Sequence, residues 1–129
     1  MRQTLSSNTV AVPPVPALTS GLVDGETVHI TGQLAFDAKV SGVPGGTDAA
    51  AQAEIIMQRI DTLLASQGLT THDLVKVTIY LTDLADLIAV NAVYTRYVSE
   101  PYPARSTIGV AFLALPGAKV EIEGFARRR

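Results

Sequence analysis

Arg105 is the residue of this sequence best placed to do chemistry. It follows a Pro-Tyr-Pro segment, which ends the preceding element because proline fixes φ and lacks a backbone donor. The alternation over residues 105–110 places Arg105 and Thr107 on the face opposite Ile108 and Val110. A guanidinium held on a strand can bind a planar carboxylate or a phosphate. An exposed strand arginine or a structural salt bridge is the ordinary alternative, and the pattern alone favours it.

Two acidic residues follow Arg105 on the last predicted strand, residues 118–126. Glu121 and Glu123 alternate there with the apolar residues Val120 and Ile122. Short strands joined by a loop of this length are commonly antiparallel neighbours, so we expect one of the glutamates to lie near Arg105 on a shared face. This geometry allows both glutamates.

The rest of the composition excludes several kinds of chemistry. The sequence has no cysteine, which excludes disulfides, thiolate nucleophiles and cysteine-based metal centres. His29 and His72 lack metal-ligand spacing, so no metal and no cofactor is expected. The net charge is −2 without a basic run inside the fold, which argues against nucleic acid as a partner. The terminal arginines, residues 127–129, are typical of a solvated tail.

Length and hydropathy predict a single globular domain over residues 1–129. The chain is 47% hydrophobic and 17% charged, which is typical of a well-cored protein. No signal-peptide pattern and no membrane-spanning apolar run is found, so a cytoplasmic protein without a membrane partner is the expectation. Residues 1–20, with three closely spaced prolines, predict an extended N-terminal arm that crosses the surface or adds an edge strand.

A strand and a helix are predicted in the first half of the chain. Residues 27–33 alternate as a strand after the hairpin signal Asp24-Gly25, in a turn region over residues 21–25. Gly32 indicates a bulge or close backbone approach. The helix is capped by Thr47 or Asp48 and ends at Gly68, with Gln52 on its polar side. Its apolar stripe is formed by Ala49, Ala53, Ile56, Ile60, Leu63 and Leu64.

A second strand and helix follow. Residues 73–81 alternate cleanly, and Thr82 or Asp83 caps a helix that stops at Glu100. The inner stripe of this helix is formed by Leu84, Leu87, Asn91, Tyr94 and Val98. Asn91 is unusual there because a buried amide needs hydrogen-bond partners, and we prefer a structural amide that holds a neighbouring loop to a catalytic role.

These elements predict an α+β fold in the order β-β-α-β-α-β-β, with two helices on one face of a mixed, mostly antiparallel sheet. The residues expected to face the helices are Val77, Ile79, Val110 and Ile122. The opposite face, which carries Thr78, Tyr80, Thr107, Gly109 and Phe125, is too apolar to stay wholly solvated. We therefore expect it to pack against another subunit, with the arginine site shared between protomers.

The chain resembles the Rid family of reactive intermediate deaminases (RidA-like), also called the YjgF/UK114 or endoribonuclease L-PSP family. The segments that carry the resemblance are residues 30–33, 49–52, 68–84, 90–94, 103–106 and 120–126. They cover nearly everything after residue 20, and the pairing of Pro-Ala-Arg-Ser with Val-Glu-Ile-Glu is specific. The resemblance implies a chorismate-mutase-like (bacillary) fold and a homotrimer with three sites in the clefts between subunits. It also implies hydrolysis of enamines and imines to 2-oxo acids and ammonia.

The resemblance also implies roles for individual residues. Arg105 would bind the carboxylate of the imino acid, and Glu121 would orient the attacking water. The other expected substrate-binding positions are Thr107, Thr31, Gly32 and Asn91. A protonated imine carbon is already electrophilic, so binding the carboxylate and positioning one water can supply much of the catalysis.

Two departures from the family leave alternatives open. Many active members carry a tyrosine where this chain has residues 16–18, and Thr107 stands where cysteine is frequent. A specialised catabolic deaminase with an aminomuconate-like substrate is one alternative. A non-catalytic trimeric protein that binds small carboxylates, or a chaperone-like protein, is another. RNA cleavage is the least attractive, because the sequence is slightly acidic and lacks paired histidines.

Overall fold

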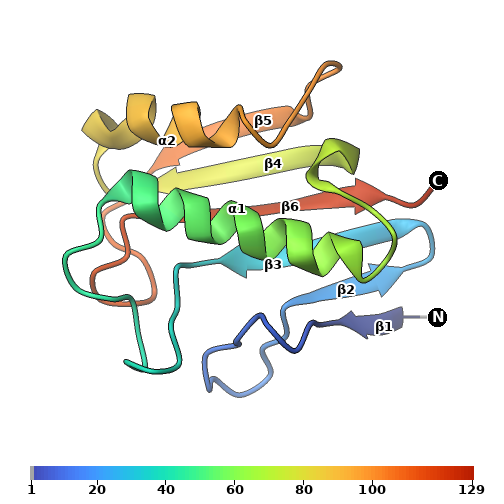
Figure 1. The fold of residues 1–129 in the computed structure, drawn as a ribbon, viewed down its shortest axis with the longest axis horizontal. Coiled ribbons are helices and arrows are strands. Elements are labelled where there is room, and N and C mark those ends of the chain that lie inside the picture. Colours follow the sequence, from blue (N-terminus) through green and yellow to red (C-terminus); the bar gives the residue numbers. More distant parts are fainter. Residues whose placement is uncertain (1) are drawn as a thin grey trace.

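The computed structural model describes residues 2–129 as one six-stranded sheet with two α-helices packed on one of its faces (Figure 1). The elements are β1 (Arg2–Leu5), β2 (Gly21–Asp24), β3 (Thr27–Gln33), α1 (Ala49–Ala65), η1 (Thr71–Asp73), β4 (Leu74–Leu81), η2 (Leu84–Asp86), α2 (Leu87–Tyr94), β5 (Ala104–Gly109) and β6 (Val120–Arg127). The predicted α+β class and helix arrangement are confirmed. The structure has one strand more than the predicted order, because β2 forms within the predicted turn region.

The first three strands form a continuous antiparallel meander. β1 pairs with β2 along the edge of the sheet, which confirms the edge-strand alternative for the arm. The predicted turn region over residues 21–25 is wrong in part, since β2 occupies most of it. The turn itself lies at Gly25, whose φ of 61° favours glycine.

The order of the strands differs from the expectation at β5 and β6. The sheet runs β1-β2-β3-β6-β4-β5, so β4 separates the two strands that we expected to be neighbours. The reason is the crossover through α2, which returns β5 parallel to β4 at the sheet edge. β6 then fills the place between β3 and β4 and runs antiparallel to both.

The parallel pairing also reverses the predicted faces of β5. Val77 aligns with Arg105, and Ile79 with Thr107, so these β5 side chains share the helix side of the sheet with core residues. Ile108 lies on the open side and is 43% exposed. Because β5 is an edge strand, its helix side can carry polar residues without burying them.

Helix α1 forms as its sequence predicts, with one exception. Asp48 accepts a hydrogen bond from the backbone N–H of Ala51, the predicted apolar stripe is buried, and Gly68 follows with a φ of 71°. The exception is Gln52, which is fully buried. Its amide donates to the carbonyl of Gly117 at 3.0 Å and accepts from the backbone N–H of Lys119 at 2.8 Å. Gln52 therefore anchors the loop that leads into β6.

Helix α2 is shorter than its periodicity predicts. Asp83 caps the short 3₁₀ turn η2, and the α-helix starts only after it. Leu84, predicted on the inner stripe, is 62% exposed, whereas Tyr94 and Val98 are buried as expected. The helix begins close to the C-terminal end of β4, and its own C-terminal end leads to the start of β5 (Figure 1).

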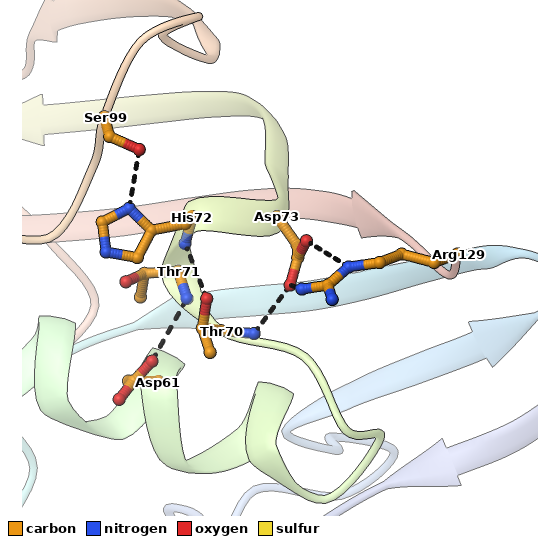
Figure 2. A network of polar contacts seen from close by, with 7 residues as sticks. All are labelled: Asp61, Thr70, Thr71, His72, Asp73, Ser99 and Arg129. Carbon is orange, nitrogen blue, oxygen red and sulfur yellow. Dashed lines mark hydrogen bonds and ion pairs between the residues drawn. The ribbon is translucent and has the colours of Figure 1, made fainter.

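The terminal arginines, residues 127–129, are all exposed as expected of a solvated tail, but two of them also form ion pairs. Arg129 donates two hydrogen bonds to the carboxylate of Asp73, of 3.0 and 2.7 Å (Figure 2). The same carboxylate also accepts a hydrogen bond from the backbone N–H of Thr70. These contacts, Arg129 first, lower the pKa of Asp73. Arg127 pairs with Glu26 at 2.5 Å. Both pairs fasten the end of β6 to neighbouring turns.

Two classes of feature are not found among residues 2–129. None of the helices has the length and apolar character needed to cross a membrane. No group of three or more His, Cys, Asp or Glu side chains is arranged to hold a metal ion in this described part of the chain.

Candidate functional site

The six predicted site residues separate into two groups within one chain. The edge group, at β5 and α2 on the helix side of the sheet, consists of Arg105, Thr107 and Asn91. The cavity group consists of Thr31 and Gly32, near the C-terminal end of β3, and Glu121, near the N-terminal end of β6.

Arg105 presents an oriented guanidinium at the sheet edge. Its Nη1 donates a hydrogen bond to Oδ1 of Asn91 at 2.6 Å, and its guanidinium carbon lies 5.1 Å from the centre of the Tyr94 ring. Arg105 is exposed and forms no salt bridge with any carboxylate in residues 2–129. The remaining N–H groups of the fork are therefore available to an anionic ligand.

Asn91 and Tyr94 hold Arg105 from α2. Their three-residue spacing puts them on one face of the helix, which explains why both reach the same guanidinium. Asn91 is the structural amide that its stripe position predicts, although it holds an arginine and not a loop. Tyr94 is only 4% exposed, its hydroxyl has no partner among the described residues, and burial raises its pKa. The sequence placed Tyr94 in the core without indicating this contact.

A second feature of the edge group is a shallow cavity of about 260 Å³ beside the guanidinium. Its lining residues are Tyr94, Thr95, Val98, Tyr102, Pro103 and Arg105. Thr107, half-buried, follows on the same face of β5 two residues after Arg105. A small anionic group could therefore approach Arg105 along the edge strand.

Glu121 is the chemically distinctive residue of the cavity group. Its side chain points to the open side of the sheet and is half-buried. Burial raises the pKa of Glu121, and the negative charge of Glu123 on the same face raises it further. A carboxylate with a raised pKa is a better proton acceptor at neutral pH than an ordinary one.

Gly32 makes room for this carboxylate. A Cβ added to Gly32 would lie 2.3 Å from Oε2 of Glu121, so any side chain there would displace the acid. The pairing of β3 with β6 shifts register between Ile30 and Gln33, which brings Gly32 to this position. The predicted bulge is confirmed, whereas the alternative of a close backbone approach is wrong, because the atoms nearest to Gly32 belong to the Glu121 side chain.

The two glutamates, equal in the sequence, differ in the structure. The Tyr80 hydroxyl donates a hydrogen bond to Oε1 of Glu123, and this contact raises the pKa of Tyr80 to about 12. Glu121 has no such side-chain partner in residues 2–129. Glu121 is therefore the acid that remains available to a ligand or a water.

A cavity of about 260 Å³, called here the arm cavity, lies between the N-terminal arm and β3. The arm contributes residues from Ala11 to Ser20 to its wall, and Glu121 lies at its floor with Thr31 and Gly32. The Thr31 backbone N–H donates to the Ser20 carbonyl at 3.0 Å, which ties the arm to β3. The sequence predicted an N-terminal arm but did not indicate that the arm forms one wall of a cavity.

Arg59 of α1 also fixes the arm, a contact that the sequence did not reveal. Its Nη1 donates to the carbonyl of Ala11 at 3.3 Å, and its Nη2 donates to the carbonyl of Phe36. Burial lowers the pKa of Arg59. Its polar position on the helix wheel is the only local signal, because the contact joins segments distant in the sequence.

The two groups cannot act together within one chain. Arg105 is on the helix side of β5, Glu121 is on the open side of β6, and β4 lies between the two strands. Two strand spacings alone amount to roughly 10 Å. Glu123 is on the open side as well, so the expectation that Glu121 or Glu123 shares a face with Arg105 is wrong.

Comparisons with known proteins add a family to this geometry. Residues 9–128 match the family described as Endoribonuclease L-PSP. The 2-iminobutanoate/2-iminopropanoate deaminase of Escherichia coli K12 is 35% identical over 130 residues, covering 95% of this chain and 99% of that protein. The crystal structure of RidA from Psychrobacter sp. PAMC 21119 superposes with a TM-score of 0.84 at 35% identity, covering 97% of this chain and 98% of that one. The structure of Escherichia coli TdcF with bound serine has a TM-score of 0.84 at 26% identity, with coverage of 98% and 99%.

Proposed function

Because this chain belongs to the endoribonuclease L-PSP family, we propose that it hydrolyses reactive 2-imino acids to 2-oxo acids and ammonia. The name of the Escherichia coli relative, a 2-iminobutanoate/2-iminopropanoate deaminase, supports this reaction class. The observation that carries the proposal is the oriented, unpaired guanidinium of Arg105, which is suited to the carboxylate of an imino acid.

In the proposed mechanism, Arg105 binds the substrate carboxylate through the N–H groups that Asn91 leaves free. The Tyr94 ring beneath the guanidinium limits its movement, so the substrate binds in one orientation. Thr107 shapes the approach along β5. This anchoring supplies proximity and orientation, which are the main needs of an already electrophilic carbon.

Glu121 orients the attacking water and accepts its proton. The water oxygen adds to the carbon of the protonated imine, and Glu121 passes the proton that it took from the water to the amine nitrogen. The C–N bond then breaks with its electron pair leaving on ammonia, while the new hydroxyl loses its proton to Glu121 and becomes the 2-oxo group. The raised pKa of Glu121 brings its proton affinity closer to the working pH. Thr31 and Gly32 shape the wall beside this water.

A complete site then requires two copies of the chain. The edge group of one copy would meet the cavity group of its neighbour, and a homotrimer closed by rotation would form three such sites. The exposed apolar residues near the edge group, Leu84, Ile88, Ile108 and Phe112, support burial of this region in an assembly.

One observation favours a second candidate function. The related TdcF structure contains bound serine, a small carboxylate. The same edge group would serve a non-catalytic protein that binds such molecules. A specialised deaminase of aminomuconate-like enamines would use the same residues with another substrate.

The test is 2-oxo acid and ammonia release from freshly generated 2-iminobutanoate and 2-iminopropanoate. Wild type should accelerate both, and Arg105→Ala should lower kcat/KM by about 100-fold, because it removes two charge-assisted hydrogen bonds. Arg128→Ala, which removes an exposed arginine outside both groups, is the matched control and should be unaffected. Calorimetric binding of a 2-oxo acid to wild type without any turnover would favour the binding protein instead.

A further inference from the structure

The arm cavity has an apolar wall beside a polar floor. The arm contributes Val12, Val15 and Leu18 to the lining, and later segments contribute Leu34, Phe36 and Leu115. Glu121 belongs to the same lining as these six aliphatic and aromatic side chains. Such a wall recognises hydrocarbon and not a charged or strongly polar group.

Two of the other polar side chains at the cavity, Arg59 and Gln33, bind backbone groups within the chain. The Arg59 guanidinium donates to two backbone carbonyls, and the Gln33 amide donates to the carbonyls of Ser20 and Thr31, at 3.4 and 3.0 Å. Both hydrogens of the Gln33 amide are therefore used, whereas Arg59 spends two of its five N–H donors on these carbonyls. The carboxylate of Glu121 is left as the distinctive polar feature of the cavity.

The cavity is a built feature and not a gap under a loose segment. Hydrogen bonds to Ser20 hold the arm at one end, and the bond from Arg59 to Ala11 holds it at the other. A volume of about 260 Å³ is too small for a drug-sized ligand and suits a side chain of several carbons.

We infer that the arm cavity binds the side chain of the substrate, and that this chain prefers 2-imino acids with branched or extended aliphatic side chains to 2-iminopropanoate. This inference rests on the proposed function. With the carboxylate on Arg105 of one copy and the reacting carbon beside Glu121 of the next, the third substituent of the planar carbon diverges from Arg105. This third substituent, the side chain of the substrate, then enters the apolar space next to Glu121.

The expected preference follows from burial of hydrocarbon. A methyl group leaves most of the cavity empty, whereas an isobutyl group contacts both walls. One buried methylene in an enzyme pocket changes kcat/KM by roughly tenfold or more. We expect kcat/KM for 2-imino-4-methylpentanoate to exceed that for 2-iminopropanoate by at least about tenfold.

The experiment compares these two imines, each generated in situ from the amino acid, with wild type and two tryptophan variants. Val15→Trp narrows the cavity at a position that is 55% exposed and so tolerates a larger side chain. Val40→Trp is the matched control, because Val40 is 58% exposed and lies outside the cavity. The readout is the ratio of the two kcat/KM values, which Val15→Trp should lower at least about tenfold and Val40→Trp should not change.

Calorimetric binding of the products keeps the inference separate from catalysis. Wild type should bind 4-methyl-2-oxopentanoate at least about tenfold more tightly than pyruvate. Equal kcat/KM for the two imines would overturn the inference and leave the proposed function intact. No turnover of either imine, with tighter binding of the longer 2-oxo acid, would overturn the proposed function and support the cavity's role. No turnover and equal binding would overturn both.

Discussion

Arg105 and Glu121 lie on opposite faces of one sheet, on strands that β4 separates. The guanidinium is oriented by α2 on the helix side, and the carboxylate lies under the arm on the open side. Neither residue has a side-chain partner of opposite charge among residues 2–129. Two groups without ion-pair partners that cannot meet within the chain are the reason why we propose a site completed between copies.

Gly32→Ala should impair catalysis with little effect on folding. The added methyl would lie 2.3 Å from Oε2 of Glu121, and the end of that flexible side chain would move aside. We expect kcat/KM to fall by about tenfold or more, because a displaced carboxylate no longer holds the water in line. Gly45→Ala is the control, since a Cβ there meets nothing within 4 Å. Steady-state kinetics with thermal unfolding of both variants checks this, and an unimpaired Gly32→Ala enzyme would argue against a role for Glu121.

The pH dependence of the reaction should respond to Glu123. Burial first and the charge of Glu123 second raise the pKa of Glu121, so the carboxylate form needed for catalysis is lost at a higher pH than for an ordinary glutamate. Glu123→Gln removes the second cause and should move the acidic limb of kcat/KM to lower pH. Comparison with wild type on the same imine cancels the titration of the substrate.

Tyr80→Phe serves as the control for that experiment. It removes the hydroxyl that donates to Glu123 but leaves the Glu123 charge in place. The acidic limb should therefore not move to lower pH. A limb that stays where it is in Glu123→Gln would show that Glu121 does not set it.

Tyr94 should act on substrate binding through its ring and not its hydroxyl. Tyr94→Phe keeps the ring under Arg105 and removes a buried hydroxyl that has no partner in the described chain, so KM should stay within about twofold of wild type. Tyr94→Leu removes the aromatic face and should raise KM by roughly twofold to fivefold. Because the carboxylate is bound in ground and transition states alike, kcat should change less than KM. Equal KM for the phenylalanine and leucine variants would contradict this role.

Gln52 should contribute to the stability of the fold and take no part in catalysis. Gln52→Leu leaves the Gly117 carbonyl and the Lys119 N–H without their partner and should lower the free energy of unfolding by about 2 kcal/mol. Gln58→Leu, at an exposed position of the same helix, should change it by less than about 0.5 kcal/mol. Urea denaturation followed by circular dichroism measures both.

The features that the sequence predicts well are local. The stripe of α1, the Asp48 cap and the alternation of β4 from Val77 onward depend on neighbouring residues, and the structure has them at the predicted positions. The alternation fails only at Val75, which is 41% exposed because the pairing of β4 with β6 shifts register between Leu74 and Lys76. The irregular pairing at Gly32 was predictable, because a glycine in an apolar alternation commonly marks a bulge or a close approach. Arg105 was detectable as a charged residue at the start of a strand.

The features that the sequence does not predict are set by partners far along the chain. The alternation of β5 is the same whether β4 or β6 lies beside it, so its pairing and the side of Arg105 depend on the crossover through α2. Gln52 and Arg59 look like surface residues on a helix wheel, yet both bind backbone groups of distant loops. Glu121 and Glu123 become distinct through the Tyr80 hydroxyl, which binds Glu123, and through Gly32 and the arm cavity, which lie beside Glu121.

The most direct measurement is complementation between two inactive variants, Arg105→Ala and Glu121→Gln. The two are unfolded together, refolded as a mixture and assayed for 2-imino acid hydrolysis against each variant refolded alone. If Arg105 of one copy works with Glu121 of the next, random assembly from equal amounts restores about a quarter of the wild-type sites. We predict that the mixture recovers about this share of wild-type activity, while each variant alone stays inactive. A mixture no more active than its components, with assemblies of wild-type size, would contradict a site shared between copies.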